Sequence, residues 1–301
     1  MVQEIARFAL TAEDIVNKVL AQNGVQGLLH LWSPVVWSTS LVLVVAWLAF
    51  GKLALGVIWE VATRTPGLRA HQVFRMPPAE GQRWREIKSS WHVFSDALLL
   101  YALVGFGAIH FAADTFAAGA LTFAVFYVWV EVWYYFTHRL MHQSNLLYSW
   151  HRSHHLTQVV TPLSSISMSW IEKCIFYTAA WLGFMAAVSW FMPVTLTGIA
   201  AYYTYHFLIS LHGHSNVEAS ALGRFMSRTV HSGSATSHAV HHARFRVNYG
   251  FSNMLLDKLL GTYSDETDVL QERAIGKQGV DSFKKSMVRP KTSAVANDLS
   301  I

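Results

Sequence analysis

Five long apolar stretches dominate the hydropathy pattern of the chain. They cover residues 34–58, 92–112, 115–136, 170–191 and 194–211, and a membrane-spanning helix needs about 20 residues. Two short links, "AADT" at 112–115 and "MPVT" at 192–195, join the second stretch to the third and the fourth to the fifth. The pattern predicts an all-α integral membrane bundle of about four or five transmembrane helices that includes two tight helical hairpins.

The two ends of the chain have a different pattern. Near the N-terminus, apolar residues recur at helical spacing among polar ones, which predicts an amphipathic interfacial segment over 1–33. No Pro/Gly/Ser-rich linker divides the middle of the chain, so 34–263 is interpreted as one membrane domain, with short helices expected around 217–229, 235–243 and 251–260. Residues 264–301 are polar and charged and are predicted to form a C-terminal tail.

Composition supports a membrane protein. The chain of 301 residues is 52% hydrophobic and only 14% charged, whereas soluble domains are about a quarter charged. Its 12 Trp, 11 Tyr and 18 Phe fit interfacial aromatic belts. The net charge of +5 is not arranged as a basic stripe, so no nucleic-acid partner is expected, and a single cysteine, Cys174, excludes an internal disulfide and a thiolate metal cluster.

The basic residues predict which side of the membrane each loop occupies. The two hairpin tips carry no Lys or Arg, while the 59–91 loop carries Arg64, Arg69, Arg75, Arg83, Arg85 and Lys88. By the positive-inside rule, the 59–91 loop, the 137–169 loop and the C-terminal region share the cytoplasmic side, where they form a helical cap. Every dense histidine cluster falls on that side.

Histidines recur at helical spacing in these cytoplasmic segments. The clusters are "HRLMH" with His138 and His142, "HRSHH" with His151, His154 and His155, and "SHAVHH" with His238, His241 and His242, and between the last two lies "LHGHSN" with His212 and His214. On a helix, residues three or four apart share a face at about 5–6 Å, close enough to bind one ion. The set exceeds what one metal accepts and predicts a site for two ions with four or five imidazoles each.

Residue identity weighs against several other histidine sites. A zinc protease of the HExxH type needs a glutamate where this chain has Arg139. A haem site would use single facing histidines, a transporter would place more ionisable residues along its spans, and a pH-sensing surface would not need i+3 and i+4 spacing in three clusters. Oxygen chemistry needs a redox metal, which zinc is not.

The order of the motifs resembles the fatty acid hydroxylase/sterol desaturase superfamily of membrane di-iron enzymes. "EVWYYFTHRLMH", "WHRSHH" and "SHAVHH" resemble its histidine boxes, "HGHSN" resembles an element before the last box, and "NYGFSNMLLDKLLGTY" at 248–263 resembles the segment after it. The resemblance covers roughly 95–263. It implies two iron ions as cofactors, O2 as co-substrate and the oxidation of a C–H bond.

The resemblance also implies roles for individual residues. The implied iron ligands are His138, His142, His151, His154, His155, His212, His214, His238, His241 and His242. Residues expected to support the ligands are Glu131, His206, His231, Asn248 and Asp257. The sequence has no GxGxxG motif and no cysteine cluster, so electrons are expected from a ferredoxin, rubredoxin or cytochrome b5 type carrier.

Taken together, the sequence predicts a multi-pass membrane enzyme that hydroxylates a lipid such as a fatty acyl chain, sphingolipid or sterol. A desaturase or a bond-cleaving oxidase with the same centre is the nearest alternative. A membrane protein that binds or senses metal without chemistry is the non-enzymatic one. The compact length favours a bacterial inner membrane over the endoplasmic reticulum, with the active site on the cytoplasmic side.

Overall fold

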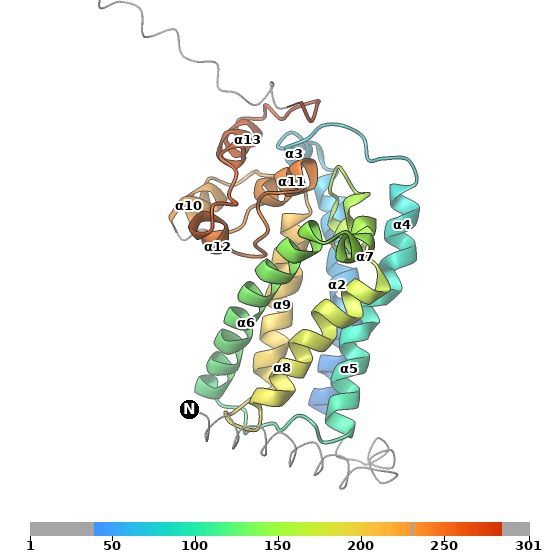
Figure 1. The fold of residues 1–301 in the computed structure, drawn as a ribbon, viewed down its shortest axis with the longest axis vertical. Helices are drawn as coiled ribbons and strands as arrows, with labels where there is room; N and C mark the ends of the chain where they lie inside the picture. The colour runs from blue at the N-terminus through green and yellow to red at the C-terminus, as the bar shows by residue number, and fades with distance from the viewer. Residues whose placement is uncertain (1–38, 230–231, 285–301) are drawn as a thin grey trace, which may run out of the picture. The chain divides into compact units, whose positions relative to one another are not determined.

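The computed structural model describes residues 39–229 and 232–284, and regular structure within these ranges is helical, without a β-strand (Figure 1). The all-α prediction is therefore confirmed. The predicted interfacial segment at 1–33, His231 and the end of the chain after residue 284 lie outside the described residues.

The described chain divides into two compact units, each built from three separate segments. Unit 1 comprises described residues up to 51 together with 93–127 and 174–204, and unit 2 comprises 52–92, 128–173 and 205–284 with 230–231 not described. The boundary passes within the three longest described helices, which therefore belong to both units: α2 (Thr39–Thr63), α6 (Phe116–Gln143) and α9 (Leu196–Gly213).

The other helices are short. Unit 1 holds α5 (Phe94–Gly105) and α8 (Ala180–Val188), and the π-helix η3 (Glu172–Ala179) begins in unit 2 and ends in unit 1. The 3-10 helix η1 (Ser90–Val93) precedes α5. The remaining helices of unit 2 are α3 (Pro66–Arg69), α4 (Gln82–Ser89), α7 (Asn145–His155), η2 (Pro162–Ile166), α10 (Ala221–Thr229), α11 (Ala235–Arg244), α12 (Leu255–Leu259) and α13 (Glu266–Ile275).

Two described helices, α2 over Ser40–Thr63 and α6 over Phe116–Gln143, are long and apolar enough to cross a membrane. Only 33% and 17% of their most apolar windows are buried within the protein, so these helices present apolar surface that a bilayer would cover. The other predicted spans are interrupted or shorter. The 92–112 stretch contains the twelve-residue α5, and the 170–191 stretch changes from π-helix to α-helix at Ala180. Four or five spans are thus not established.

The two predicted hairpin tips lie side by side in unit 1. Phe111 forms an isolated parallel bridge with Val194, and the Ala112 amide donates to the Val194 carbonyl at 2.8 Å. Thr122 on α6 holds the second tip, because its hydroxyl accepts from the Thr195 amide at 3.0 Å. The tips are held by backbone and hydroxyl hydrogen bonds, which explains why polar residues interrupt the apolar pattern there.

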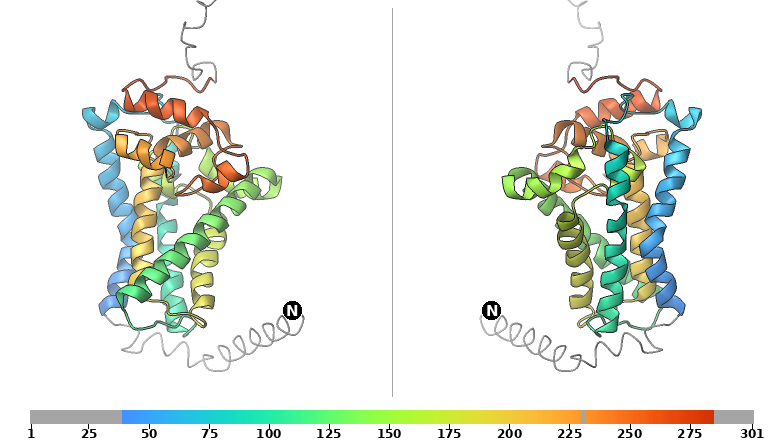
Figure 2. Two further views of the ribbon diagram at one scale, coloured as in Figure 1. Left: turned by 90° about the vertical axis from the view of Figure 1, so that its left-hand side faces the viewer. Right: turned by 90° about the vertical axis from the view of Figure 1, so that its right-hand side faces the viewer.

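Part of the predicted C-terminal tail belongs to the core of unit 2. Helices α11 and α13 lie against each other (Figure 2), and Leu270, Ala274 and Val280 are buried with Phe74 and Val240. Leu270 and Ala274 are four residues apart and therefore share one face of α13. The polar residues on the other faces obscure this narrow apolar stripe in the sequence.

Candidate metal centre

The histidines of the candidate centre come from four segments of unit 2. The end of α6 carries His138 and His142, α7 carries three histidines, His214 follows α9, and α11 carries three more. Helix α11 begins with a capping box, in which the Ser234 side chain accepts from the Ser237 amide at 3.0 Å and the Ser237 hydroxyl accepts from the Ser234 amide at 2.9 Å. Local capping thus sets where the buried histidine face of α11 starts.

Nine of the ten predicted ligand histidines gather into two groups, in each of which the candidate ligand atoms lie within 4.8 Å of one another. The five-histidine group consists of His138, His142, His151, His155 and His241. The four-histidine group consists of His154, His214, His238 and His242. His212, the remaining member of the prediction, belongs to neither group. It sits in the last turn of α9, where the ring of His214, two residues later, takes the inward position.

Within each group the Nε2 atoms face one another. In the five-histidine group the Nε2 atom of His155 lies 2.9 Å from that of His151 and 3.1 Å from that of His241. In the four-histidine group the Nε2 separations are His214–His238 2.9 Å, His154–His242 3.1 Å, His238–His242 3.1 Å and His154–His214 3.4 Å. Metal–nitrogen bonds of about 2.0–2.1 Å at angles of about 90–110° place neighbouring nitrogens roughly 2.8–3.4 Å apart.

The opposite ring nitrogen, Nδ1, is anchored to the surrounding chain in six of the nine histidines. Five donate to backbone carbonyls: His138 to Tyr249 at 2.9 Å, His154 to Ser167 at 3.0 Å, His214 to Ser210 at 2.8 Å, His241 to Val247 at 2.7 Å and His242 to Thr157 at 2.7 Å. His151 donates to the Glu172 carboxylate at 2.6 Å. A carbonyl oxygen only accepts, so Nδ1 carries the proton and the neutral ring turns a bare Nε2 lone pair inward.

Lone pairs that face each other at about 3 Å repel, and a shared cation removes that repulsion. In the pairs His154–His214 and His154–His242 both rings are fixed in this tautomer by their carbonyl partners. Protein ligands of a metal typically donate their outer N–H to a carbonyl or carboxylate in the same way. The residues present therefore fit a metal ion in each group.

Burial keeps these rings neutral. Burial lowers the pKa of His151 to about 3, and burial, with a contribution from the neighbouring His151, lowers the pKa of His154 to about 4. Burial also holds the pKa values of His214, His238 and His242 well below the ordinary value, and the neighbouring histidines add to the effect. Because a metal binds only the neutral imidazole, the rings are ready to coordinate at neutral pH.

Two of the predicted supporting residues, Asn248 and Asp257, hold the loop that orients His138. The Asp257 carboxylate accepts from the amides of Tyr249 at 2.8 Å and Gly250 at 2.7 Å, while the Tyr249 carbonyl accepts from His138. A Cβ atom at Gly250 would lie 2.8 Å from Asp257 Oδ2, so this approach requires glycine. Asn248, at a positive φ of 56°, donates to the Ser237 carbonyl at 3.0 Å and links the loop to α11.

The two other predicted supporting residues that the structure describes, Glu131 and His206, have different neighbours. Glu131 accepts from the amide and the hydroxyl of Ser252 rather than from a histidine. Its seven-residue spacing from His138 corresponds to about 10 Å along α6, too far for a direct bond. His206 stacks on Phe251 at 4.9 Å between ring centroids and belongs to neither histidine group.

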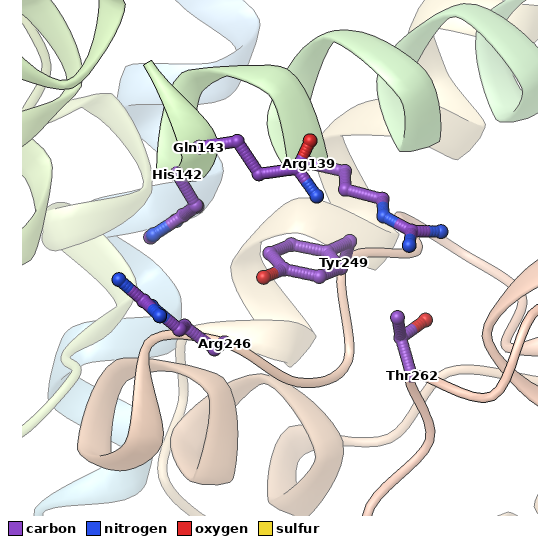
Figure 3. Close-up of a pocket in the computed structure, with 6 residues that line it drawn as sticks. All are labelled: Arg139, His142, Gln143, Arg246, Tyr249 and Thr262. Carbon is purple, nitrogen blue, oxygen red and sulfur yellow. The ribbon is translucent and has the colours of Figure 1, made fainter. Parts of the chain in front are cut away.

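Sequence reasoning missed Glu172 and Tyr249 as neighbours of the histidines. Glu172 is an isolated carboxylate in an apolar stretch, a signal that the sequence contains, but its pairing with His151 across 21 residues depends on the fold. The Tyr249 ring packs on His138 and His142 with centroid distances of 5.7 and 5.5 Å. It also lines a cavity of about 320 Å³ with Arg139, His142, Gln143, Arg246 and Thr262 (Figure 3).

Comparison with known proteins agrees with this geometry. A family model described as fatty acid hydroxylase matches residues 123–262, a range that includes all nine clustered histidines. Over this range the chain belongs to the fatty acid hydroxylase/sterol desaturase superfamily, an iron-dependent group of oxidative lipid-modifying enzymes. The predicted family is thereby confirmed, and with the two long apolar helices it indicates membrane association.

Similar curated proteins come from plants. Protein CER1-like 1 of Arabidopsis thaliana is 32% identical over 155 residues, which are 48% of this chain and 24% of that protein. The very-long-chain aldehyde decarbonylases CER1 of Arabidopsis thaliana and GL1-6 of Oryza sativa subsp. indica are each 27% identical, over 48% and 50% of this chain and 24% of their own length. The chain spans about a quarter of these relatives. No solved structure matches it.

Proposed function

We propose that this chain is an O2-dependent, non-haem di-iron membrane enzyme that hydroxylates an unactivated C–H bond of a lipid. The observation that carries the proposal is the pair of histidine groups whose Nε2 atoms converge while six of the nine rings donate outward through Nδ1. The five-histidine group would hold one iron and the four-histidine group the other. When bound, the irons would supply the redox chemistry of O2 activation and hydrogen abstraction.

The protein's own contribution is to position and protect the centre. The outward Nδ1–H bonds fix the tautomer and angle of six of the nine rings, and the Glu172 carboxylate increases the donor strength of His151. Seven of the nine rings are buried and exclude water, while His142 and His238 are partly exposed. Exclusion of water protects a strongly oxidising centre from side reactions.

A lipid substrate fits the surroundings of the centre in this proposal. The cavity beside His142 is lined by two arginines and polar side chains, so it does not suit an alkyl chain. The apolar surfaces of α2 and α6 are where lipid would approach. Electrons would come from a separate carrier of the ferredoxin, rubredoxin or cytochrome b5 type. We further propose several membrane crossings with the histidine groups on the cytoplasmic side, as the distribution of basic residues predicts.

A second candidate reaction is cleavage of a bond in a long-chain aldehyde. It is favoured by the named aldehyde decarbonylases among the similar proteins. Both reactions would use the same centre and differ in which carbon the substrate presents to it.

Product analysis separates the two reactions. Lipids from cells that express the wild type would be compared by mass spectrometry with lipids from cells that express His154→Ala. Hydroxylation yields a lipid heavier by one oxygen, and aldehyde cleavage yields a hydrocarbon one carbon shorter than its precursor. Purified protein is expected to contain about two irons and to form product only with O2 and a reductant. Identical lipids in both cell types, together with iron-free protein, would refute the proposal.

A further inference from the structure

The basic residues of the 59–91 segment gather around a second cavity in unit 2. Its volume is about 500 Å³, and four of the six basic residues of that segment line it: Arg64, Arg69, Arg75 and Arg83. Arg85 and Lys88 do not. The positive-inside rule requires only that positive charges lie on one side of a membrane. It does not account for four guanidinium groups around one hollow.

Acidic neighbours offset two of the four arginines. Glu60 contacts Arg64 at 3.0 Å and Arg83 at 2.5 Å, and Arg83 also contacts Glu86 at 3.0 Å. Among the described residues, no carboxylate pairs with Arg69 or Arg75. The cavity therefore keeps an excess of positive charge.

The donors around the cavity are not all used. Arg75 donates through Nη2 to the carbonyls of Lys277 at 2.5 Å and Ala70 at 3.4 Å, which leaves its other N–H groups available. Within the described part of the chain, the side chains of Arg69 and Gln72 make no hydrogen bond, although both line the cavity. Guanidinium groups bind phosphate with paired hydrogen bonds, and several of them around one hollow are the usual means of binding that group.

The position of the cavity points to a lipid source of phosphate. Glu60, Thr63 and Arg64 belong to the last turn of α2 and the residue after it. If α2 crosses the membrane as proposed, this end lies at the level of the headgroups. Glu60 also has a buried carboxylate oxygen, Oε2, without a hydrogen-bond partner in the described structure. A headgroup hydroxyl would supply the missing donor.

We infer that this cavity binds a phosphate group, in particular that of an anionic phospholipid headgroup such as phosphatidylglycerol. The lipid source rests on the proposed membrane crossing of α2, whereas the phosphate chemistry rests on the arginines alone. The site is separate from the histidine groups, since none of the nine histidines lines the cavity. It would anchor the end of α2 to the membrane surface.

Calorimetric titration of the detergent-purified full chain tests the inference. The probes are short-chain phosphatidylglycerol, diacylglycerol with the same acyl chains, and inorganic phosphate. Phosphatidylglycerol is expected to bind and diacylglycerol is not. Arg69→Gln is expected to weaken phosphatidylglycerol binding roughly tenfold, since it removes a charged hydrogen-bond donor. It should fold normally because Arg69 is exposed and makes no side-chain bond.

Lys88→Gln is the matched control, because it removes the same charge from the same segment but not from the cavity. Its binding should equal the wild type. If inorganic phosphate binds as tightly as phosphatidylglycerol and with the same dependence on Arg69, the site is supported and its ligand is a soluble phosphate. The inference would be overturned if diacylglycerol bound as tightly as phosphatidylglycerol, or if Arg69→Gln and Lys88→Gln lost equal amounts of phosphatidylglycerol affinity. Because binding requires no turnover, these results are independent of whether the chain oxidises lipids.

Discussion

The two histidine groups are alike in their converging Nε2 atoms but differ in the charged residues that surround the rings. Both converge through Nε2 atoms, but the five-histidine group has an acidic neighbour, the Glu172 carboxylate on His151. The four-histidine group has a basic one. Lys52 donates to the Ser210 hydroxyl at 3.1 Å, and the carbonyl of the same serine accepts from His214.

This difference predicts that the two proposed irons are not equivalent. A carboxylate stabilises the positive charge of a metal through the ring it contacts, whereas a nearby ammonium disfavours that charge. The four-histidine group also has fewer ligands. We therefore expect it to bind its ion less tightly and to lose it first.

Substitution of one ligand in each group should have the largest effect. His242→Ala leaves three histidines in its group and is expected to reduce iron from about two ions per chain to about one, with activity lost. His155→Ala leaves four histidines and should retain more metal. Elemental analysis of the purified proteins measures both. Equal iron loss in the two variants would contradict the inequivalence.

Removal of the metal should have the next largest effect. A chelator restores the repulsion between facing lone pairs, so the midpoint of thermal unfolding should fall by many degrees. Because burial lowers the pKa of His151 to about 3 and of His154 to about 4, the unfolded chain takes up protons first as the pH falls below about 6.5. The metal-free protein should therefore lose further stability between about pH 6.5 and 4. Calorimetry with and without chelator, at several pH values, checks this.

Glu172→Gln is expected to lower metal affinity about 10- to 100-fold, mainly in the five-histidine group, because it removes the charge on the partner of His151. The matched control is Glu131→Gln, which changes a buried carboxylate that contacts Ser252 instead of a histidine. Competition with a metal-binding dye gives both affinities. A comparable loss in the control would show that the effect is not specific to the pairing with His151.

Asp257→Asn should have the smallest effect on metal binding. An amide nitrogen would replace one of the two oxygens that accept from the Tyr249 and Gly250 amides, which costs about 1–3 kcal/mol of stability. The loop would then hold His138 less firmly, with iron affinity reduced less than in Glu172→Gln. Thermal unfolding and dye competition on the same sample separate the two consequences. Unchanged stability would contradict the proposed support of the loop.

Much of the candidate centre could be predicted from local spacing. Intervals of three and four residues put His151, His154 and His155 on one helical face without knowledge of the rest of the fold. His212 and His214 were instead assigned from the resemblance of "HGHSN" to an element of the superfamily, and only His214 joins a group. At the end of α9 the helical period no longer decides which ring points inward.

The sequence alone determined the helical class, the superfamily and nine histidines that the structure brings together, because helical periodicity and motif order are local properties. Only the tertiary structure divided those histidines five to four, paired Glu172 with His151 and grouped four arginines around one cavity. These relations join residues that are far apart in the chain. Their distances depend on how the helices pack, which hydropathy and spacing do not encode.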